Sequence, residues 1–236
     1  MALLPPVFTK GGMQITSLQK SAYIFASCIA AYLVFITVLV VTQPDSVLHE
    51  LFSETGFFET ASIYLWGLAA VAVPICLRPV GLRESAITLF FVLCALREAD
   101  WHKKFTVTGI SKMNYYTKTD APLVEKFLAA MVVGLFILLV AYLIVSFFKQ
   151  FRRRESLDVR ATFIACAGLF VLFLTKALDR SLSMIKRRVG IQFSDQFKHY
   201  VGAYEEGLEM VAPLLFLVAL LVHRFVTAKR REISHP

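Results

Sequence analysis

Charged residues are scarce in this chain. Of its 236 residues, 57% are hydrophobic and only 18% are charged. In soluble domains, roughly 45–50% of residues are apolar and about 25% are charged. The mean hydropathy is +0.65. This composition excludes a soluble globular domain, a disordered chain and a collagen-like repeat, and it indicates an integral membrane protein.

Cysteines are few, and the short motifs of common catalytic sites are missing. The four cysteines contain no Cys-x-x-Cys pair, so they are interpreted as small apolar packing residues. The zinc motif His-Glu-x-x-His and the hydrolase motifs Gly-x-Ser-x-Gly and Pro-Ser-Gly-His are absent. The last apolar segment also has no His-x-x-x-His. No motif therefore assigns the chain to a family.

Long apolar runs are what the chain does contain. They lack the period-two alternation of membrane-barrel strands, so they predict helices, each needing about 20 residues to cross the hydrocarbon. Six segments fit: 22–41, 57–77, 82–101, 123–148, 160–178 and 206–226. The sequence thus predicts an all-α polytopic membrane protein with six transmembrane helices in a bundle. These helices would form one integral membrane domain over residues 1–236.

Basic residues divide almost evenly between the two sides that six spans define. However, the first connection, Gln43–Gly56, has no Lys or Arg, whereas Lys149–Arg154 is short and densely basic. By the positive-inside rule, both termini are predicted to be cytoplasmic, and the expected location is a bacterial inner membrane. The net charge of +8 is then explained by the basic residues that set the topology, and it would also attract anionic lipid. No nucleic-acid partner is expected.

Carboxylates gather on the predicted periplasmic side. All 17 acidic residues lie there except Glu84, Glu155, Asp158 and Glu232. We counted about 20 residues from the cytoplasmic charge of each span, at about 1.5 Å per residue. This count brings charged groups of four spans to one depth, among them Glu59, Glu98, Lys176 and Glu209.

Spacing predicts a shared direction for these groups. Three pairs are four residues apart, so each pair would occupy one helix face: Glu98 with His102, Glu205 with Glu209, and Lys176 with Arg180. Ionisable groups at this depth face the bundle interior, a partner or a wet cavity. Two interpretations stay open. The charges are either ion pairs that join the helices, such as Lys176 with Glu209, or a functional site.

The residue types indicate what such a site would do. Zn²⁺ or another divalent ion accepts carboxylate and imidazole ligands, and the candidate ligands are Glu98, His102, His199 and Glu205. A further carboxylate can act as a general base, and the candidate catalytic residues are Glu98, Glu209 and Asp179. Two long periplasmic connections offer cations for phosphate headgroups: Lys103, Lys104, Arg180, Lys186, Arg187 and Arg188.

Two function classes follow from these residues. The first is a membrane enzyme that hydrolyses or transfers a lipid or lipid-linked substrate at the periplasmic face, with a divalent metal as candidate cofactor. The alternative is a non-enzymatic transporter or lipid-binding accessory subunit whose charges are ion pairs or a substrate path. The middles of all six predicted spans lack charges, which argues against ion or proton transport. The expected partner in both classes is membrane lipid, including anionic headgroups.

Overall fold

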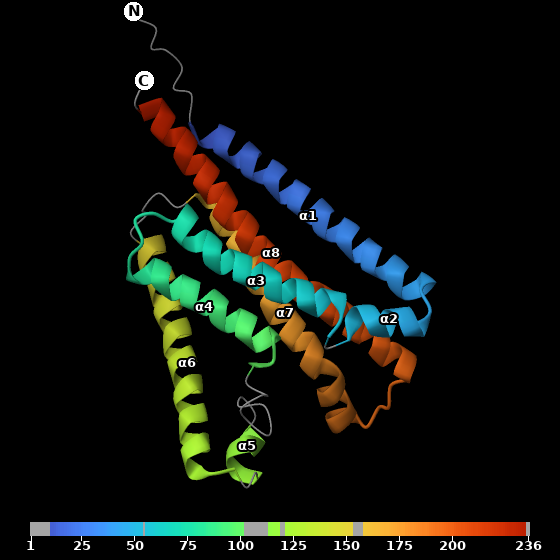
Figure 1. Cartoon of the computed structure of the whole chain (residues 1–236). Helices are drawn as coiled ribbons and strands as arrows, with labels where there is room; N and C mark the ends of the chain where they lie inside the picture. Colours follow the sequence, from blue (N-terminus) through green and yellow to red (C-terminus); the bar gives the residue numbers. More distant parts are fainter. Residues whose placement is uncertain (1–9, 54, 102–112, 119–120, 153–157, 235–236) are drawn as a thin grey trace, which may run out of the picture. The chain divides into compact units, whose positions relative to one another are not determined.

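The computed structural model describes residues 10–53, 55–101, 113–118, 121–152 and 158–234. Every regular element in these ranges is a helix, which confirms the predicted all-α class. The chain divides into two units, Met1–Gln43 and Pro44–Pro236. The first unit holds α1 (Lys10–Thr42), and the second holds α2 to α8 (Figure 1). The single domain predicted over residues 1–236 stays a prediction.

Two threonine hydroxyls in the apolar part of α1 form hydrogen bonds within the helix. α1 begins at Lys10, before the predicted span start at residue 22, and its apolar stretch is Ala26–Thr42. The hydroxyl of Thr37 donates to the carbonyl of Leu33, and that of Thr42 donates to the carbonyl of Val38, each at 2.7 Å. Such bonds return a hydroxyl to its own helix, as an apolar environment requires.

The helices of the second unit range from about two turns to about eleven turns in length. Their bounds are α2 (Asp45–Phe52), α3 (Phe57–Cys76), α4 (Leu82–Glu98), α5 (Met113–Lys118), α6 (Leu123–Arg152), α7 (Val159–Val189) and α8 (Asp195–Ser234).

Four stretches of the described residues are long and apolar enough to cross a membrane. They are Asp45–Cys76, which includes α3, and parts of α6, α7 and α8: Leu123–Gln150, Val159–Leu178 and Gln196–Ala228. The 17 residues of α4 and the apolar stretch of α1 fall short of this length. The chain is therefore a helical membrane protein with four candidate spans, and the predicted bundle of six is confirmed only in part.

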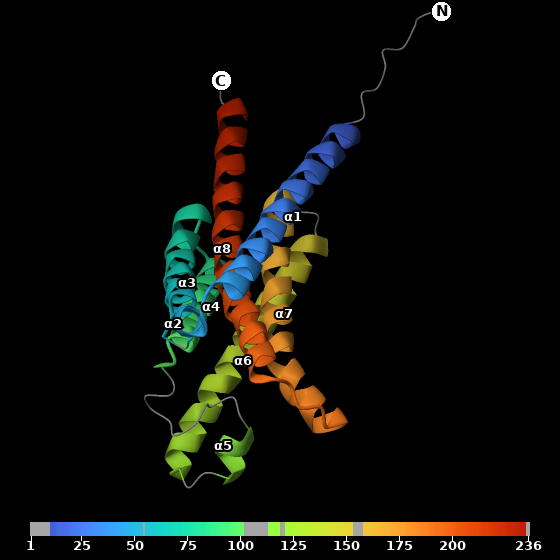
Figure 2. The same ribbon diagram turned by 90° about the vertical axis from the view of Figure 1, so that its right-hand side faces the viewer.

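Aromatic side chains form the centre of the packing in the second unit. α8 packs against both α3 and α7, and it lies between them in Figure 2. Trp66 of α3 is 1% exposed, and its ring centroid is 5.7 Å from that of Phe216 on α8 and 5.6 Å from that of Phe91 on α4. Phe90 of α4 in turn stacks on Phe136 of α6, with centroids 6.1 Å apart. These contacts join four helices through large apolar surfaces.

α7 and α8 run antiparallel and approach closely at Gly168. A Cβ atom at this position would lie 3.4 Å from side-chain atoms of Leu215 and Phe216 on α8. Small residues at such points let two membrane helices approach and gain van der Waals contact. α6, by contrast, exposes most of its apolar side chains, as a helix facing lipid does.

The turn from α2 into α3 needs a glycine. A Cβ atom at Gly56 would lie 2.4 Å from the carbonyl oxygen of Leu51, so any side chain there would force the backbone to move. Phe52 and Phe58 stack across this turn with ring centroids 4.5 Å apart. The turn therefore fixes where α3 begins, and with it the position of Glu59.

A short hydrogen bond joins α5 to α6. The hydroxyl of Tyr115 donates to Glu125 Oε1 at 2.6 Å, and Tyr115 is fully buried. Burial, together with the hydrogen bond and charge of Glu125, raises the pKa of Tyr115 to about 12.

Two helix ends differ from the sequence prediction. α4 ends at Glu98 rather than at residue 101, and Asp100 adopts a left-handed conformation with φ 49°, which Asp tolerates better than most residues. α7 extends to Val189 and α8 begins at Asp195. The long connection predicted between the fifth and sixth spans is therefore mostly helical.

Candidate functional site

A cluster of charged side chains lies where α3, α4, α7 and α8 meet, near the N-terminal end of α3. The charged cluster comprises Glu59, Arg97, Glu98, Lys176, Glu205, Glu206 and Glu209. Glu209 of α8 is 8% exposed and accepts a hydrogen bond from Lys176 of α7. The Lys176 side chain is 41% exposed, so only the carboxylate half of this ion pair is buried.

A second ion pair is formed within α4. The guanidinium of Arg97 donates to Glu98 Oε1, and the exposed fractions of the two side chains are 46% and 10%. Both pairs thus join a buried carboxylate to a cation that reaches the protein surface. Long cationic side chains near the end of a membrane helix extend in this way toward water.

Electrostatic interactions connect the two pairs and extend the charged cluster to α3. Glu98 interacts with Glu209 and Lys176, and Arg97 also interacts with Glu209. Glu206 interacts with four other carboxylates, namely Glu59, Glu98, Glu205 and Glu209. Five carboxylates from three helices therefore lie close to two cations, so the described members carry an excess of negative charge.

Ser62 adds an uncharged polar group on the α3 side. It lies three residues after Glu59 and therefore close to the same helix face. Ser62 is 1% exposed, and its hydroxyl has no hydrogen-bond partner among the residues that the structure describes. A buried hydroxyl without a partner costs free energy, so this group is available to a bound water or substrate atom.

The structure brings together four of the residues that helix counting placed at one depth: Glu59, Glu98, Lys176 and Glu209. The predicted candidate Glu205 adjoins Glu206 and interacts with it. His199 is exposed on α8, about two turns before Glu206, and no described contact joins it to the charged cluster. The catalytic and metal-binding roles of these residues stay predictions.

Several predicted residues lie outside what the structure describes. His102, Lys103 and Lys104 fall in the undescribed segment 102–112, and the side chains of Asp179 and Arg187 are also undescribed. Arg180, Lys186 and Arg188 are exposed on α7 beyond the candidate span, which ends at Leu178. Lys186 and Arg188 were predicted in a connection and lie instead on α7, whereas Arg180 was predicted, and is found, on the same helix as Lys176.

The spacing argument that paired Glu98 with His102 depends on a helix that continues to residue 102, which itself lies outside the described residues. Residues four apart share a face only within a continuous helix, and α4 ends at Glu98. In addition, the described ranges contain no group of three or more His, Cys, Asp or Glu residues that could hold a metal ion. Carboxylates can interact electrostatically over distances far longer than the bond of about 2 Å that a metal requires.

Sequence reasoning missed Arg97 and Glu206. Both are direct neighbours of predicted residues, Glu98 and Glu205, and a search for four-residue spacing passes over neighbours. A count of all charges at the predicted depth, without the spacing requirement, would have found them. Whether Arg97 and Glu206 reach the charged cluster depends on how α4 and α8 are rotated about their axes. The packing of these helices sets that rotation.

The chain matches no protein-family profile, no curated protein and no solved structure. The class that the fold and the charged cluster define is therefore a helical membrane protein with an acidic site near one end of its α3–α8 pair.

Proposed function

We propose that the charged cluster is a site where this membrane protein acts on a lipid or lipid-linked substrate. One observation carries the proposal: carboxylates and cations from four helices converge in a protein whose candidate spans are otherwise apolar. Ionisable groups are costly in such segments, and they are typical of sites that bind substrates or transfer protons.

The members of the charged cluster suit hydrolysis or group transfer. Glu98 and Glu209 are buried carboxylates in contact with a cation, and such a carboxylate can accept or donate a proton at a reacting group. Lys176 and Arg97 reach the surface, where they would bind an anionic oxygen of the substrate. Arg180, Lys186 and Arg188 on α7 would attract a phosphate headgroup before it enters the site.

A divalent ion, Zn²⁺ or another, belongs to the proposal as a candidate cofactor. The excess of carboxylates over cations supports it, because a divalent cation would offset their mutual repulsion. It would lower the pKa of a bound water and so supply the attacking group. Elemental analysis of the purified protein tests this part. We expect a stoichiometric metal that Glu98→Gln or His102→Ala removes, and a metal-free active protein would overturn it.

Lipid conversion tests the proposed activity. Purified protein in nanodiscs is incubated with a total membrane lipid extract, with and without added Zn²⁺ or Mg²⁺, and lipid species are followed by mass spectrometry. We expect one species to be consumed, at a rate that falls about 100-fold or more in Glu98→Gln and in Glu209→Gln. Glu50→Gln is the matched control, because Glu50 is an exposed carboxylate of α2 outside the charged cluster. Unchanged rates in both cluster variants would refute the assignment.

The two ion pairs favour a second function, that of a non-enzymatic transporter or lipid-binding accessory subunit. The bond between Lys176 and Glu209 joins α7 to α8, as charges with a purely structural role would. In that case the wild-type protein would bind lipid and leave every species of the extract unconverted. The same mass spectra therefore separate the two functions.

The proposed location is a bacterial inner membrane with both termini in the cytoplasm. The support is the absence of Lys and Arg from Gln43–Gly56 and the dense basic segment Lys149–Arg154. Reporter fusions after Gln43, Met113 and Phe193 should signal from the periplasm, and fusions after Arg154 and Pro236 from the cytoplasm. A cytoplasmic signal at Met113 would reverse the orientation and move the charged cluster to the inner face.

A further inference from the structure

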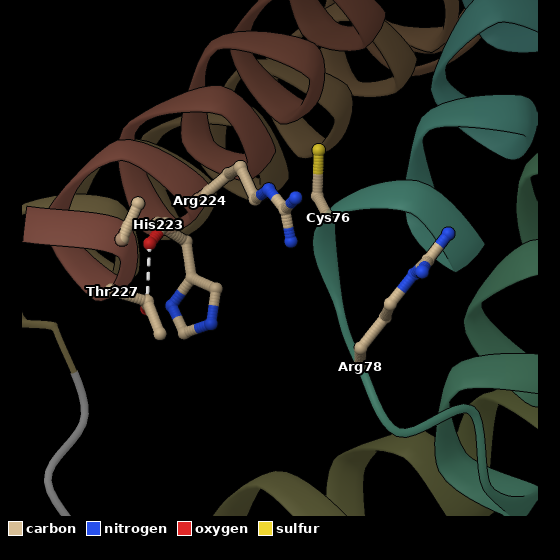
Figure 3. Close-up of a pocket in the computed structure, with 6 residues that line it drawn as sticks. Cys76, Arg78, His223, Arg224 and Thr227 are labelled. Atoms are coloured by element: carbon tan, nitrogen blue, oxygen red, sulfur yellow. Dashed lines mark hydrogen bonds between the residues drawn. The ribbon is translucent and has the colours of Figure 1, made fainter. Parts of the chain in front are cut away.

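A second polar feature lies at the other end of the α3–α8 pair. It is a cavity of about 240 Å³ between the end of α3 and the later turns of α8 (Figure 3). Its lining contains two arginines, one histidine and no carboxylate: Cys76, Arg78, His223, Arg224, Thr227 and Ala228. We call it the basic cavity.

The basic cavity and the charged cluster lie near opposite membrane surfaces. α3 and α8 run in the same direction, because Glu59 interacts with Glu206 at one end and Cys76 interacts with Arg224 at the other. α3 rises about 25 Å from Glu59 to Cys76, which is close to the hydrocarbon thickness of about 30 Å. Two candidate spans end at Cys76 and Ala228, so the basic cavity lies at the level of lipid headgroups.

The cations of the basic cavity are the guanidinium groups of Arg78 and Arg224. Neither Arg78 nor Arg224 pairs with a carboxylate in the part of the chain that the structure describes. Arg224 extends from α8 toward Cys76 (Figure 3). Arg78 donates its Nε to the carbonyl of Pro74, at 3.4 Å, and no hydrogen bond to another described residue uses its terminal nitrogens.

We propose that the basic cavity binds the phosphate group of an anionic phospholipid. The planar donor fork of arginine fits phosphate oxygens, and two forks on one cavity give several charge-assisted hydrogen bonds. Basic pockets between membrane helices at the headgroup level bind lipid phosphates in this way. Ile75 and Phe225, next to cavity residues, expose their apolar side chains and would contact acyl chains. That apolar surface favours a lipid over free phosphate. The site is independent of the function proposed for the charged cluster.

Lipid retention by the purified full chain tests this site. The protein is exposed to mixed micelles containing phosphatidylglycerol or, at equal mole fraction, phosphatidylcholine, and bound lipid is measured by native mass spectrometry. We expect a preference for phosphatidylglycerol in the wild type. Arg78→Gln and Arg224→Gln should each weaken this binding roughly tenfold, as the loss of one charge-assisted bond implies.

Arg160→Gln is the matched control. Arg160 is exposed in the first turn of α7, at the same end of the antiparallel α7–α8 pair, but it does not line the basic cavity. We expect this variant to keep the full preference. An equal loss in Arg160→Gln would show that surface charge alone attracts the lipid, and it would overturn the proposal.

Two further arms complete the test. If inorganic phosphate alone raises the unfolding temperature of the wild type without any lipid preference, the basic cavity is a free-anion site and the lipid assignment is wrong. If a glutamine variant fails to fold, Arg224→Lys replaces it, because lysine keeps the charge and loses the fork. A folded Arg224→Lys protein should retain less phosphatidylglycerol than the wild type, and undiminished retention would contradict the proposed contact.

Discussion

Removal of one half of the Lys176–Glu209 pair should destabilise the protein far more than removal of the other half. Glu209 is 8% exposed, whereas the Lys176 side chain is 41% exposed. Lys176→Met leaves a buried carboxylate without its cation. Glu209→Gln instead leaves an ammonium group that can extend to water. We therefore expect Lys176→Met to be the more damaging change.

The size of the difference follows from this asymmetry. A buried charge that loses its partner costs about 3–5 kcal/mol, and the lower value applies to Lys176→Met because Arg97 still interacts with Glu209. Exposed pairs contribute about 0–1 kcal/mol, which is the range for Glu209→Gln. At about 2–4 °C per kcal/mol for a chain of roughly 150–250 residues, Tm should fall by about 6–12 °C in Lys176→Met. In Glu209→Gln it should fall by less than about 4 °C.

Thermal unfolding in a mild detergent, followed by tryptophan fluorescence, measures both changes. The double variant Lys176→Met/Glu209→Gln is the control, and it should recover most of the loss because it leaves no buried carboxylate without its cation. Equal losses in the two single variants, or a larger loss in Glu209→Gln, would refute the reasoning from burial. The comparison also tells whether Glu209→Gln is folded well enough for the lipid-conversion test.

Two further predictions concern the turn before α3 and the attachment of α5. Gly56→Ala should lower the free energy of unfolding by about 1–3 kcal/mol, because its Cβ would meet the Leu51 carbonyl at 2.4 Å. Gly67→Ala, with no atom within 4 Å of the added carbon, should not destabilise in the same assay. The Tyr115 pKa is about 12 when folded and 10.0 in its ordinary state, so the unfolded chain loses this proton first. The stabilising contribution of Tyr115 is complete below pH 10 and is lost between pH 10 and about 12. The protection factors of the α5 amides, which correct for the intrinsic base catalysis of exchange, should therefore fall over this interval in the wild type, and Tyr115→Phe should remove that fall.

Hydropathy located the helices because a membrane-spanning helix needs an apolar run long enough to cross the hydrocarbon. α3, α6, α7 and α8 all overlap predicted spans. Helix ends were predicted less well, because they depend on local conformation rather than on hydropathy. The left-handed Asp100 follows the early end of α4, and α7 continues to Val189 through basic residues that favour helix but lack an apolar pattern.

The candidate site was predictable in depth but not in contacts. Helix rise is constant, so counting alone brought Glu59, Glu98, Lys176 and Glu209 to one level. Pairing depends on helix rotation and on tertiary packing, which the sequence does not state. Arg97 and Glu206 were missed for that reason. The basic cavity was also missed, because it joins the end of α3 to residues of α8 that are far apart in the chain.

The close approach at Gly168 has a mechanical consequence for the charged cluster. Gly168 holds α7 against Leu215 and Phe216 of α8, and Lys176 lies about two turns, or about 12 Å, farther along α7. α7 and α8 pack against each other along their length, so the crossing angle set near Gly168 also sets the separation of their side chains farther along. A crossing angle different by about 10° would place Lys176 about 2 Å farther from Glu209, which is enough to break a hydrogen bond. An uncharged residue in the apolar interior thus helps to define the helix geometry on which the ion pair depends.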